Sequence, residues 1–285
     1  MEPKVDVIIL HTIPNSKILL DCLESVKRTN YKNYSIVVVD NNSKDPIVDT
    51  LENVEIIKLK KNMGYAGGNN VALKRSKAEY CVLLNDDTIV DENWLKALVD
   101  VAEKDPKIAA LQPKLKDLNK KDFFEFAGAA GGFIDKYGYG ICRGRVFDKV
   151  EKDYGQYDQR VEIFWASGAA LFLRRSAVEE VGYLDEDFFI YAEEVDLCWR
   201  LRLAGYKILF VPSSVVYHIG GATTGRTKKV KFKTEYLLHR NHLIILIKNY
   251  SFKTLLKILP VKLFLEVLAF FAFLFKSPKK SFAIL

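Results

Sequence analysis

The first 115 residues alternate short apolar runs with segments of helical periodicity, and this pattern limits the folds open to the chain. The β-branched and apolar runs occupy residues 5–12, 34–40, 54–59, 80–85 and 108–113. The helical segments lie between them, at residues 16–29, 45–53, 65–78 and 92–105. Strands and helices that alternate at this spacing are typical of a mostly parallel sheet flanked by helices. The sequence therefore predicts an α/β fold with a Rossmann-like central sheet.

Polar residues that favour turns follow four consecutive predicted strands. They occupy positions 11–12, 40–42, 62–64 and 85–87. In open sheets of this kind, ligands bind beyond the carboxyl ends of the strands. We therefore expect these four segments to share one binding edge.

The fourth of these segments is Asn85-Asp86-Asp87, directly after the apolar run 81–84. Adjacent carboxylates repel each other and resist burial. Taken alone, such a triplet is more often a turn or a helix N-cap than a metal site. A divalent cation shared with a phosphate would relieve the repulsion. The residues alone leave both interpretations open.

A second acidic cluster, Glu193, Glu194 and Asp196, follows the aromatic run 188–191 in a predicted helix over 188–207 that ends at Gly205. The helix dipole favours acidic residues in a first helical turn, and these residues need have no other role. Asp196 also has the spacing of an ordinary ion pair with Arg200. Three carboxylates in four residues would equally suit a general base beside a pocket.

Residues 116–221 have a less regular pattern. Residues 116–160 are predicted to form a loop or loose strands, 161–175 a strand, and the next segment a helix ending near Gly182. Residues 207–221 are predicted to form a strand pair containing His218, which is a buried structural histidine by default and a metal ligand as the alternative. The four cysteines are widely spaced, which favours reduced thiols over disulfides or zinc.

The C-terminal segment 226–285 carries 13 Lys and Arg against two acidic residues and is apolar at helical spacing. Lys257, Lys262 and Glu266 interrupt the run of about 20 apolar residues that a bilayer span needs. We expect helices that lie in a membrane interface with lysines reaching anionic headgroups. The alternative is a helical hairpin packed on the α/β body. Nucleic acid is disfavoured as a partner, because the basic residues are embedded in Leu, Ile and Phe.

Six ordered motifs together resemble a family 2 glycosyltransferase of the GT-A fold, close to its rhamnosyltransferase-like branch. They are VDVIILHTIPNS (5–16), IVVVDNNSKD (36–45), NMGYAGGNN (62–70), LLNDDT (83–88), SGAALFLRR (167–175) and the segment 182–207, followed by Tyr-His at 217–218. The resemblance covers about residues 5–240. A nicotinamide-dependent oxidoreductase is disfavoured because no GxGxxG follows the first strand, and a P-loop nucleotidase because no GK[ST] occurs.

The resemblance assigns roles on the donor side. It implies that Asp40 binds the uracil or thymine edge, with Thr12, Pro14 and Asn42 lining the nucleoside pocket. The loop beneath base and ribose would contain Asn62, Gly64 and Asn69.

The resemblance also assigns the reacting groups. Asp86 would contact the ribose or sugar, Asp87 would bind Mg²⁺ or Mn²⁺, and His218 would be a second ligand of the metal or diphosphate. The catalytic base falls on Glu194, where the family usually has Asp, so Glu193 or Asp196 could share that role. Asn85 stands at the first position of the DxD-type motif, which leaves fewer charges on the metal.

The implied function is inverting transfer of a sugar from a UDP- or dTDP-sugar to a hydroxyl of a glycan or lipid-linked acceptor. We expect a catalytic domain over 1–225, with a nucleotide-sugar half at about 1–115 and an acceptor half at about 116–225. Residues 226–285 would associate with the inner face of the cell membrane from the cytoplasm. The alternative is a non-catalytic protein that binds nucleotide-sugars or glycans and retains the fold.

Overall fold

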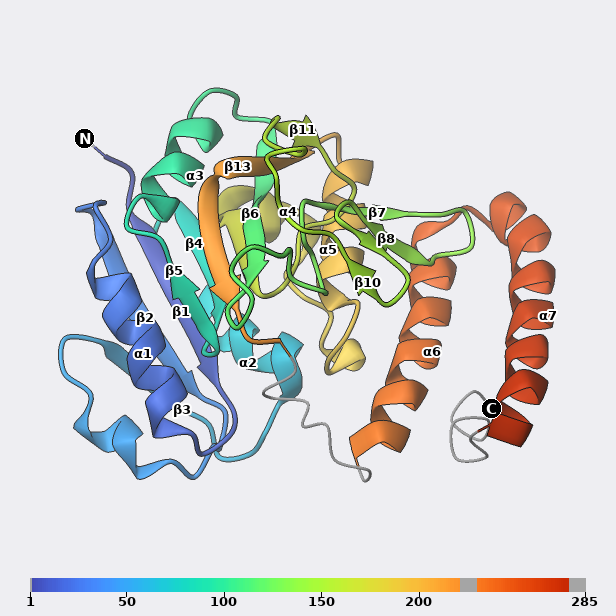
Figure 1. Cartoon of the computed structure of the whole chain (residues 1–285), viewed down its shortest axis with the longest axis horizontal. Helices are drawn as coiled ribbons and strands as arrows, with labels where there is room; N and C mark the ends of the chain where they lie inside the picture. Colours follow the sequence, from blue (N-terminus) through green and yellow to red (C-terminus); the bar gives the residue numbers. More distant parts are fainter. Residues whose placement is uncertain (1, 221–229, 277–285) are drawn as a thin grey trace.

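The computed structural model describes residues 2–220 and 230–276. A nine-stranded sheet forms the centre, in the order β11–β13–β6–β12–β4–β1–β2–β3, with β5 paired to β13 (Figure 1). Its strands are β1 (Val5–His11), β2 (Tyr34–Asp40), β3 (Glu55–Lys58), β4 (Tyr80–Asn85), β5 (Thr88–Val90), β6 (Ile108–Asp117), β11 (Val161–Glu162), β12 (Ala170–Arg174) and β13 (Lys207–His218). Strands β1, β2, β3, β4, β6 and β13 share one direction, while β12 runs antiparallel between β4 and β6. The expected mostly parallel sheet is confirmed.

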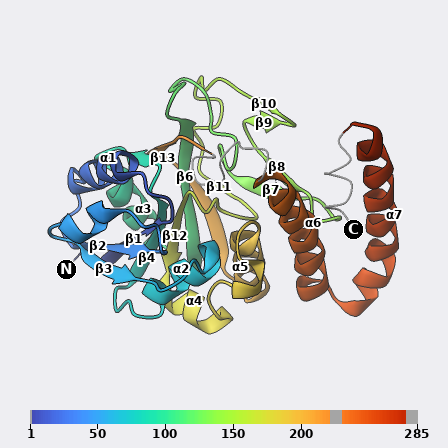
Figure 2. The ribbon, with the colours of Figure 1, turned by 90° about the horizontal axis from the view of Figure 1, so that it is seen from below.

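Helices cover both faces of this sheet (Figures 1 and 2). They are α1 (Ser16–Lys27), α2 (Gly64–Leu73), α3 (Trp94–Ala102), α4 (Arg175–Val181), α5 (Glu193–Leu203), α6 (Val230–Asn249) and α7 (Phe252–Lys276), with short 3-10 turns η1 (Pro46–Thr50) and η2 (Glu186–Phe188). Alternate residues of β1 point to opposite faces, as strand geometry requires. Val7 packs in the core beneath α1 and α3, and Ile8 in the core beneath α2, α4 and α5.

Several sequence-based element predictions need correction. The predicted helix 188–207 starts only at Glu193, because Phe189, Tyr191 and Ala192 have positive φ and cannot be helical. The predicted helix 45–53 is only the turn η1. The predicted strand 161–175 is split into β11 and β12, and the predicted strand pair 207–221 contains the single strand β13 with a register shift between Val211 and Val215. The helix ending at Gly182, whose φ is 80°, is confirmed.

The middle of the chain has only short strands, in agreement with the predicted loop or loose strands over 116–160. Strands β7 (Gly132–Ile134) and β8 (Gly140–Cys142) form one hairpin, and β9 (Arg145–Val146) and β10 (Lys149–Val150) form another. Strand β5 was not predicted from the sequence. This strand pairs Thr88 with His218, and therefore brings the Asn85-Asp86-Asp87 segment to the end of β13.

The two C-terminal helices lie at one side of the molecule, with α7 beyond α6 (Figures 1 and 2). Helix α6 packs against α5 through Trp199, Ile245 and Leu246, all buried. In α7, Lys262 and Glu266 are buried and form an ion pair at 2.7 Å, so the expectation that Lys262 reaches outward to headgroups is wrong. Across residues 2–220 and 230–276, none of the helices combines the length and the apolar character that a membrane span requires. The expected domain boundary at 225/226 and the end of the expected extension, 277–285, lie outside the described residues.

Candidate active site

A pocket of about 490 Å³ lies beside the ends of β2 and β3. Asp40 and Asn42 line it, together with Lys44, Asp45, Pro46, Asp49, Lys58, Leu59 and Lys60. Asp40 also accepts a hydrogen bond from the Ser43 N–H at 2.8 Å, which fixes the turn after β2. The pocket thus contains two of the residues that were expected to hold the nucleoside. Thr12 is partly exposed and Pro14 exposed after β1, but neither lines this pocket.

The expected loop beneath base and ribose is tied to the end of β2 by Asn41, which is fully buried. The Asn41 side chain accepts from the Met63 N–H at 2.8 Å and donates to Asn62 Oδ1 at 3.2 Å and the Gly64 carbonyl at 3.1 Å. Asn69 is buried on α2, where its amide donates to the Tyr65 carbonyl at 3.0 Å. This network holds the 62–64 loop rigidly against the sheet edge.

Asp86 is buried against His11, the last residue of β1. His11 Nδ1 lies 2.7 Å from Asp86 Oδ2, and His11 Nε2 lies 3.3 Å from Asp45 Oδ2. Burial opposes a charge on His11, but the two carboxylates outweigh it and raise the pKa of the imidazole. Burial in turn raises the pKa of Asp86, which His11 partly offsets. His11 is thus part of the site, although the sequence marked only its position at a strand end.

Asp87 and His218 lie side by side at the same edge of the sheet. His218 Nε2 is 3.0 Å from Asp87 Oδ1 and 3.3 Å from the side-chain amide of Asn85. On the other side of the ring, His218 Nδ1 lies 3.4 Å from Glu125 Oε1. Burial opposes the charge on His218, yet Asp87 and Glu125 outweigh it and raise the pKa of the imidazole to about 10. No sequence signal had marked Glu125, which lies in the irregular segment after β6.

A divalent cation could bind this pair by displacing the proton that Asp87 and Glu125 hold on His218. Asp87 Oδ1 and His218 Nδ1 are buried, and in the described part of the chain neither atom has a hydrogen bond beyond the ion-pair contacts just given. In that same part of the chain, no three His, Cys, Asp or Glu side chains are grouped so that they could hold a metal by themselves. Mg²⁺ and Mn²⁺ are commonly bound by one or two carboxylates, with water and substrate phosphates completing the coordination. Two protein ligands therefore suffice only if a diphosphate supplies others.

Glu193 and Glu194 open α5, next to α2. Glu193 is buried, and its Oε2 has no hydrogen-bond partner among residues 2–220 and 230–276, whereas Glu194 is partly exposed. Burial, reinforced by the neighbouring charge of Glu194, raises the pKa of Glu193 well above its usual range. Burial raises the pKa of Glu194 to about 7. The pKa of Tyr65 is also raised, by burial and then by these two carboxylates.

Tyr65 and the strand end of β4 meet the same short segment. The Tyr65 hydroxyl donates to the Gly168 carbonyl at 2.6 Å, and the Asn85 N–H donates to the next carbonyl, that of Ala169, at 3.0 Å. Consecutive carbonyls thus bind Tyr65, on which the charges of Glu193 and Glu194 act, and the backbone of Asn85, two residues before Asp87. The sequence did not single out Tyr65, although it follows Gly64 directly.

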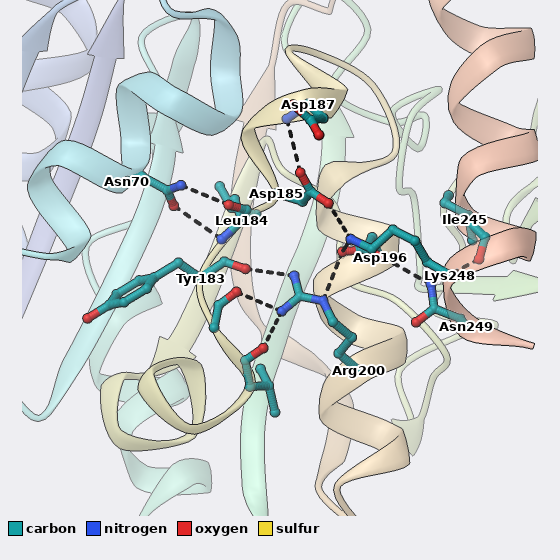
Figure 3. A network of polar contacts seen from close by, with 12 residues as sticks. Asn70, Tyr183, Leu184, Asp185, Asp187, Asp196, Arg200, Ile245, Lys248 and Asn249 are labelled. Atoms are coloured by element: carbon teal, nitrogen blue, oxygen red, sulfur yellow. Dashed lines mark hydrogen bonds and ion pairs between the residues drawn. The ribbon is translucent and has the colours of Figure 1, made fainter.

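Asp196 is engaged elsewhere (Figure 3). It is fully buried, and Arg200 Nε at 2.9 Å and Lys248 Nζ at 3.0 Å both contact its Oδ2. The Asn249 amide donates to its Oδ1 at 3.0 Å. With both oxygens bound to α5 and α6, this carboxylate joins two helices and is poorly placed to accept a proton from a substrate.

Known proteins resemble this chain in sequence over most of its length. N-acetylglucosaminyl-diphospho-decaprenol L-rhamnosyltransferase of Mycobacterium tuberculosis is 27% identical over 224 residues, covering 72% of this chain and 72% of that protein. Uncharacterized protein y4gI of Sinorhizobium fredii is 27% identical over 256 residues, covering 80% of this chain but only 26% of its own length.

The fold also matches solved glycosyltransferases. The crystal structure of GalNAc-T7 with UDP, GalNAc and Mn²⁺ aligns with a TM-score of 0.67 at 17% identity, covering 86% of this chain and 47% of that one. The chain thus spans about half of that protein, and the likeness shows that it has the GT-A fold. The model of Glycosyl transferase family 2 matches residues 7–182, more than half of the chain, and the chain belongs to this family.

Proposed function

We propose that this chain is an inverting glycosyltransferase that moves a sugar from a UDP- or dTDP-sugar to a hydroxyl of a glycan or lipid-linked acceptor. One observation carries the proposal: the consecutive carbonyls of Gly168 and Ala169 bind Tyr65, whose pKa is raised by burial and by the charges of Glu193 and Glu194, and the Asn85 N–H, two residues before Asp87 of the buried Asp87–His218 pair. Two sets of groups that suit a leaving diphosphate and an attacking hydroxyl therefore meet at one edge of the sheet.

On the donor side, Asp40 and Asn42 would bind the base, and the 62–64 loop with Asn69 would support base and ribose. Asp86, held by His11, would accept a hydrogen bond from the ribose or sugar. Asp87 and His218 would hold Mg²⁺ or Mn²⁺, and such an ion, when bound, would neutralise the charge that grows on the departing diphosphate. The GalNAc-T7 structure, determined with UDP and Mn²⁺, supports this assignment by analogy of fold.

On the acceptor side, we assign the general base to Glu194. It is partly exposed, and a pKa near 7 suits a base that must be deprotonated yet able to take a proton at neutral pH. Glu194 would accept the proton of the acceptor hydroxyl as that oxygen attacks the anomeric carbon. Because the reaction needs the carboxylate form, kcat/KM is expected to rise as the pH increases through about 7. A single displacement without a protein nucleophile inverts the anomeric configuration.

The division into a nucleotide-sugar half and an acceptor half, and a cytoplasmic location at the inner membrane face, belong to this proposal. Eight large apolar side chains of α7 are 39–74% exposed: Phe252, Leu256, Val261, Leu263, Phe264, Val267, Leu268 and Phe271. Lys253 and Lys257 are exposed on the same helix. An apolar helix surface flanked by basic residues suits an anionic bilayer surface, where a lipid-linked acceptor would be found. The decaprenol-linked acceptor named for the mycobacterial relative is consistent with this.

Thermal stabilisation by nucleotides tests the donor site. UDP, dTDP, GDP and NAD are each added with Mn²⁺ or with EDTA to the wild type, to Asp87→Asn and to Asp148→Asn, an exposed control on the β9–β10 turn. We expect UDP or dTDP to raise Tm only with Mn²⁺, and this effect to be lost in Asp87→Asn alone, because bound ligand stabilises the folded state. No stabilisation by any nucleotide, or stabilisation indifferent to metal and to Asp87, would support a protein that retains the fold without this activity.

A further inference from the structure

The turn that precedes α5 has an unusual backbone. The Ile190 N–H donates to the Phe188 carbonyl at 2.7 Å around Phe189, whose φ is 63° and ψ is −60°. This is the three-residue turn with positive φ, which is rare and strained. Tyr191 and Ala192 follow with φ of 75° and 72°, values that side chains other than glycine seldom adopt. Glu193 and Glu194 come directly after this turn.

Two helices hold the turn from opposite sides. On the donor side, the Phe189 carbonyl accepts from the first N–H groups of α2, those of Tyr65 at 2.7 Å and Ala66 at 3.3 Å. A Cβ atom on Gly64 would lie 2.2 Å from this carbonyl oxygen, so the close approach depends on a glycine there. The turn is thus in direct contact with the loop assigned to the nucleotide.

On the other side, α6 provides the fully buried side chain of Asn241. Its amide nitrogen lies 3.1 Å from the Phe188 carbonyl, 2.9 Å from that of Ile190 and 2.6 Å from that of Tyr191. One side chain therefore binds three carbonyls, whose dipoles repel one another at this distance. In a regular helix these carbonyls would point along the helix axis. The neighbouring Arg240 donates to the Asp187 carbonyl at 2.6 Å and to that of Phe188 at 3.1 Å.

We propose that Asn241 is a positioning residue for transfer, which holds the 188–191 turn in its strained form and thereby aims Glu194 at the acceptor hydroxyl. The inference rests on the proposed function and extends the active site to a helix that contributes no group to the reaction. Strained backbone persists only where surrounding contacts determine it, and such segments cluster at functional sites. Release of the turn would reorient the first residues of α5 without disturbing the pocket beside Asp40.

A matched pair of asparagines on α6 provides the test. Asn241→Ala removes the contacts to the turn, whereas Asn249→Ala removes a contact between α6 and Asp196 of α5 and leaves the turn intact (Figure 3). Transfer is measured as release of UDP or dTDP from UDP-GlcNAc or dTDP-rhamnose, with GlcNAc-diphospho-decaprenol as acceptor. Amide hydrogen exchange at Ile190 and Tyr65 is followed in the same proteins.

For Asn241→Ala we expect kcat to fall about 10- to 100-fold, because misplaced reacting groups lower kcat. The donor KM should stay within about twofold, because Asn41 still holds the 62–64 loop when the turn is released. Exchange at Ile190 and Tyr65 is expected to become about tenfold faster or more. Asn249→Ala should keep kcat within about twofold. Asn241→Gln, which keeps the amide but displaces it by one methylene, supplies the same kcat comparison in case the alanine variant does not fold.

Three results would overturn the inference. If Asn241→Ala or Asn241→Gln keeps the wild-type kcat, the turn does not aim the base. If both asparagine-to-alanine variants lose kcat equally, Asn241 acts only by docking α6. If the wild type binds nucleotide with metal but transfers no sugar, the proposed function and the inference are both wrong. If the wild type transfers sugar and Asn241→Ala is equally active, only the inference is wrong.

Discussion

The two C-terminal helices are similar in sequence and different in role. Both are apolar at helical spacing with scattered lysines. Helix α6 buries Ile245 and Leu246 against α5 and uses Asn241 and Lys248 to contact the turn and Asp196 beside the candidate base. Helix α7 leaves eight large apolar side chains exposed and faces α6 with a buried Lys262–Glu266 pair.

The difference lies in what the polar side chains do. In α6 they bind backbone carbonyls of the 188–191 turn and the Asp196 carboxylate, so this helix is docked beside the candidate site. In α7 the buried pair is completed by His239 of α6, 2.7 Å from Glu266, and by the Tyr139 ring of the β7–β8 hairpin, so it contacts neither the 188–191 turn nor Asp196. Apolar content alone does not separate an integral helix from a peripheral one; the partners of the buried polar groups do.

The largest predicted contrast concerns the apolar contacts of the two helices. Trp199 of α5 packs with Ile245 and Leu246 and meets the Tyr250 ring edge-on, with centroids 4.9 Å apart. Trp199→Ala is expected to lower the free energy of unfolding by about 3–5 kcal/mol, because it leaves a cavity under α6. Phe264→Ala on α7, where the ring is 60% exposed, should change it by less than about 0.5 kcal/mol. Unfolding in guanidinium measures both changes in the free energy of unfolding. Equal changes would mean that the apolar side chains of α7 are packed as tightly as those between α5 and α6.

The second prediction concerns the buried pair in α7. Lys262 is fully buried, with its Nζ 3.6 Å from the centroid of the Tyr139 ring and 2.7 Å from Glu266. Lys262→Ala leaves Glu266 with one fewer partner and is expected to cost about 1–3 kcal/mol. Lys257→Ala, at an exposed position of the same helix, should stay within about 0.5 kcal/mol. Urea unfolding compares the two, and a neutral Lys262→Ala would mean that α7 is not docked through this pair.

The third prediction is a pH dependence at the seam between α6 and α7. Burial, and then the charge of Lys262, lowers the pKa of His242 to about 4 from an ordinary value of 6.5. The unfolded chain therefore takes up a proton first as the pH falls, so stability is full above pH 6.5 and decreases toward pH 4, by roughly 1–2 kcal/mol. Glu266, with a pKa lowered to about 2, loses its contribution only below its ordinary value of 4.5.

Thermal unfolding between pH 7.5 and 4.5 measures this effect. His242→Gln should flatten the curve in that range. The other groups around His242 that take part in its electrostatics are His239, Glu266 and Asp135, in addition to Lys262. A wild-type Tm that does not change between pH 6.5 and 4.5 would contradict a neutral, partly buried His242.

The smallest effect on stability is expected from the exposed surface of α7. The double variant Phe264→Ser with Leu268→Ser should leave the free energy of unfolding within about 0.5 kcal/mol of the wild type. Its binding to anionic vesicles should fall about tenfold or more, because each side chain would lose apolar burial in the bilayer. Phe147→Ser, at a position 89% exposed on the β9–β10 turn, is the control. Co-sedimentation that is equal in all three proteins would contradict a membrane role for α7.

The sequence was most informative where contacts are local. Strands β1, β2 and β4 follow from β-branched apolar runs, and their parallel arrangement places Asp40 and the Asn85-Asp86-Asp87 segment at one edge. The same reasoning could not find Glu125 or Asn241, since each reaches the site through contacts distant in sequence: Glu125 through His218, and Asn241 through a turn 50–53 residues away.

Helical periodicity also misled at one functional segment. Residues 188–192 have a helix-like apolar pattern, but tertiary contacts from Tyr65 and Asn241 hold them in a strained turn. Local propensity cannot indicate such a turn, because its hydrogen-bond partners come from α2 and α6. Asp196 had the same composition signal as Glu194, and only the structure separates a carboxylate enclosed by Arg200 and Lys248 from one that is partly exposed.

Transfer by Glu194→Gln tests the central claim most directly. Nucleotide release from the donor is measured with and without GlcNAc-diphospho-decaprenol, beside metal-dependent stabilisation by UDP or dTDP. We predict that stabilisation by nucleotide persists in Glu194→Gln and that transfer falls about 10²- to 10⁴-fold, the usual contribution of a general base. The loss of transfer in Glu193→Gln should be at least about ten times smaller, because the raised pKa of Glu193 already favours its protonated form. Transfer by Glu194→Gln within about tenfold of the wild type would contradict the assignment of the base to the start of α5.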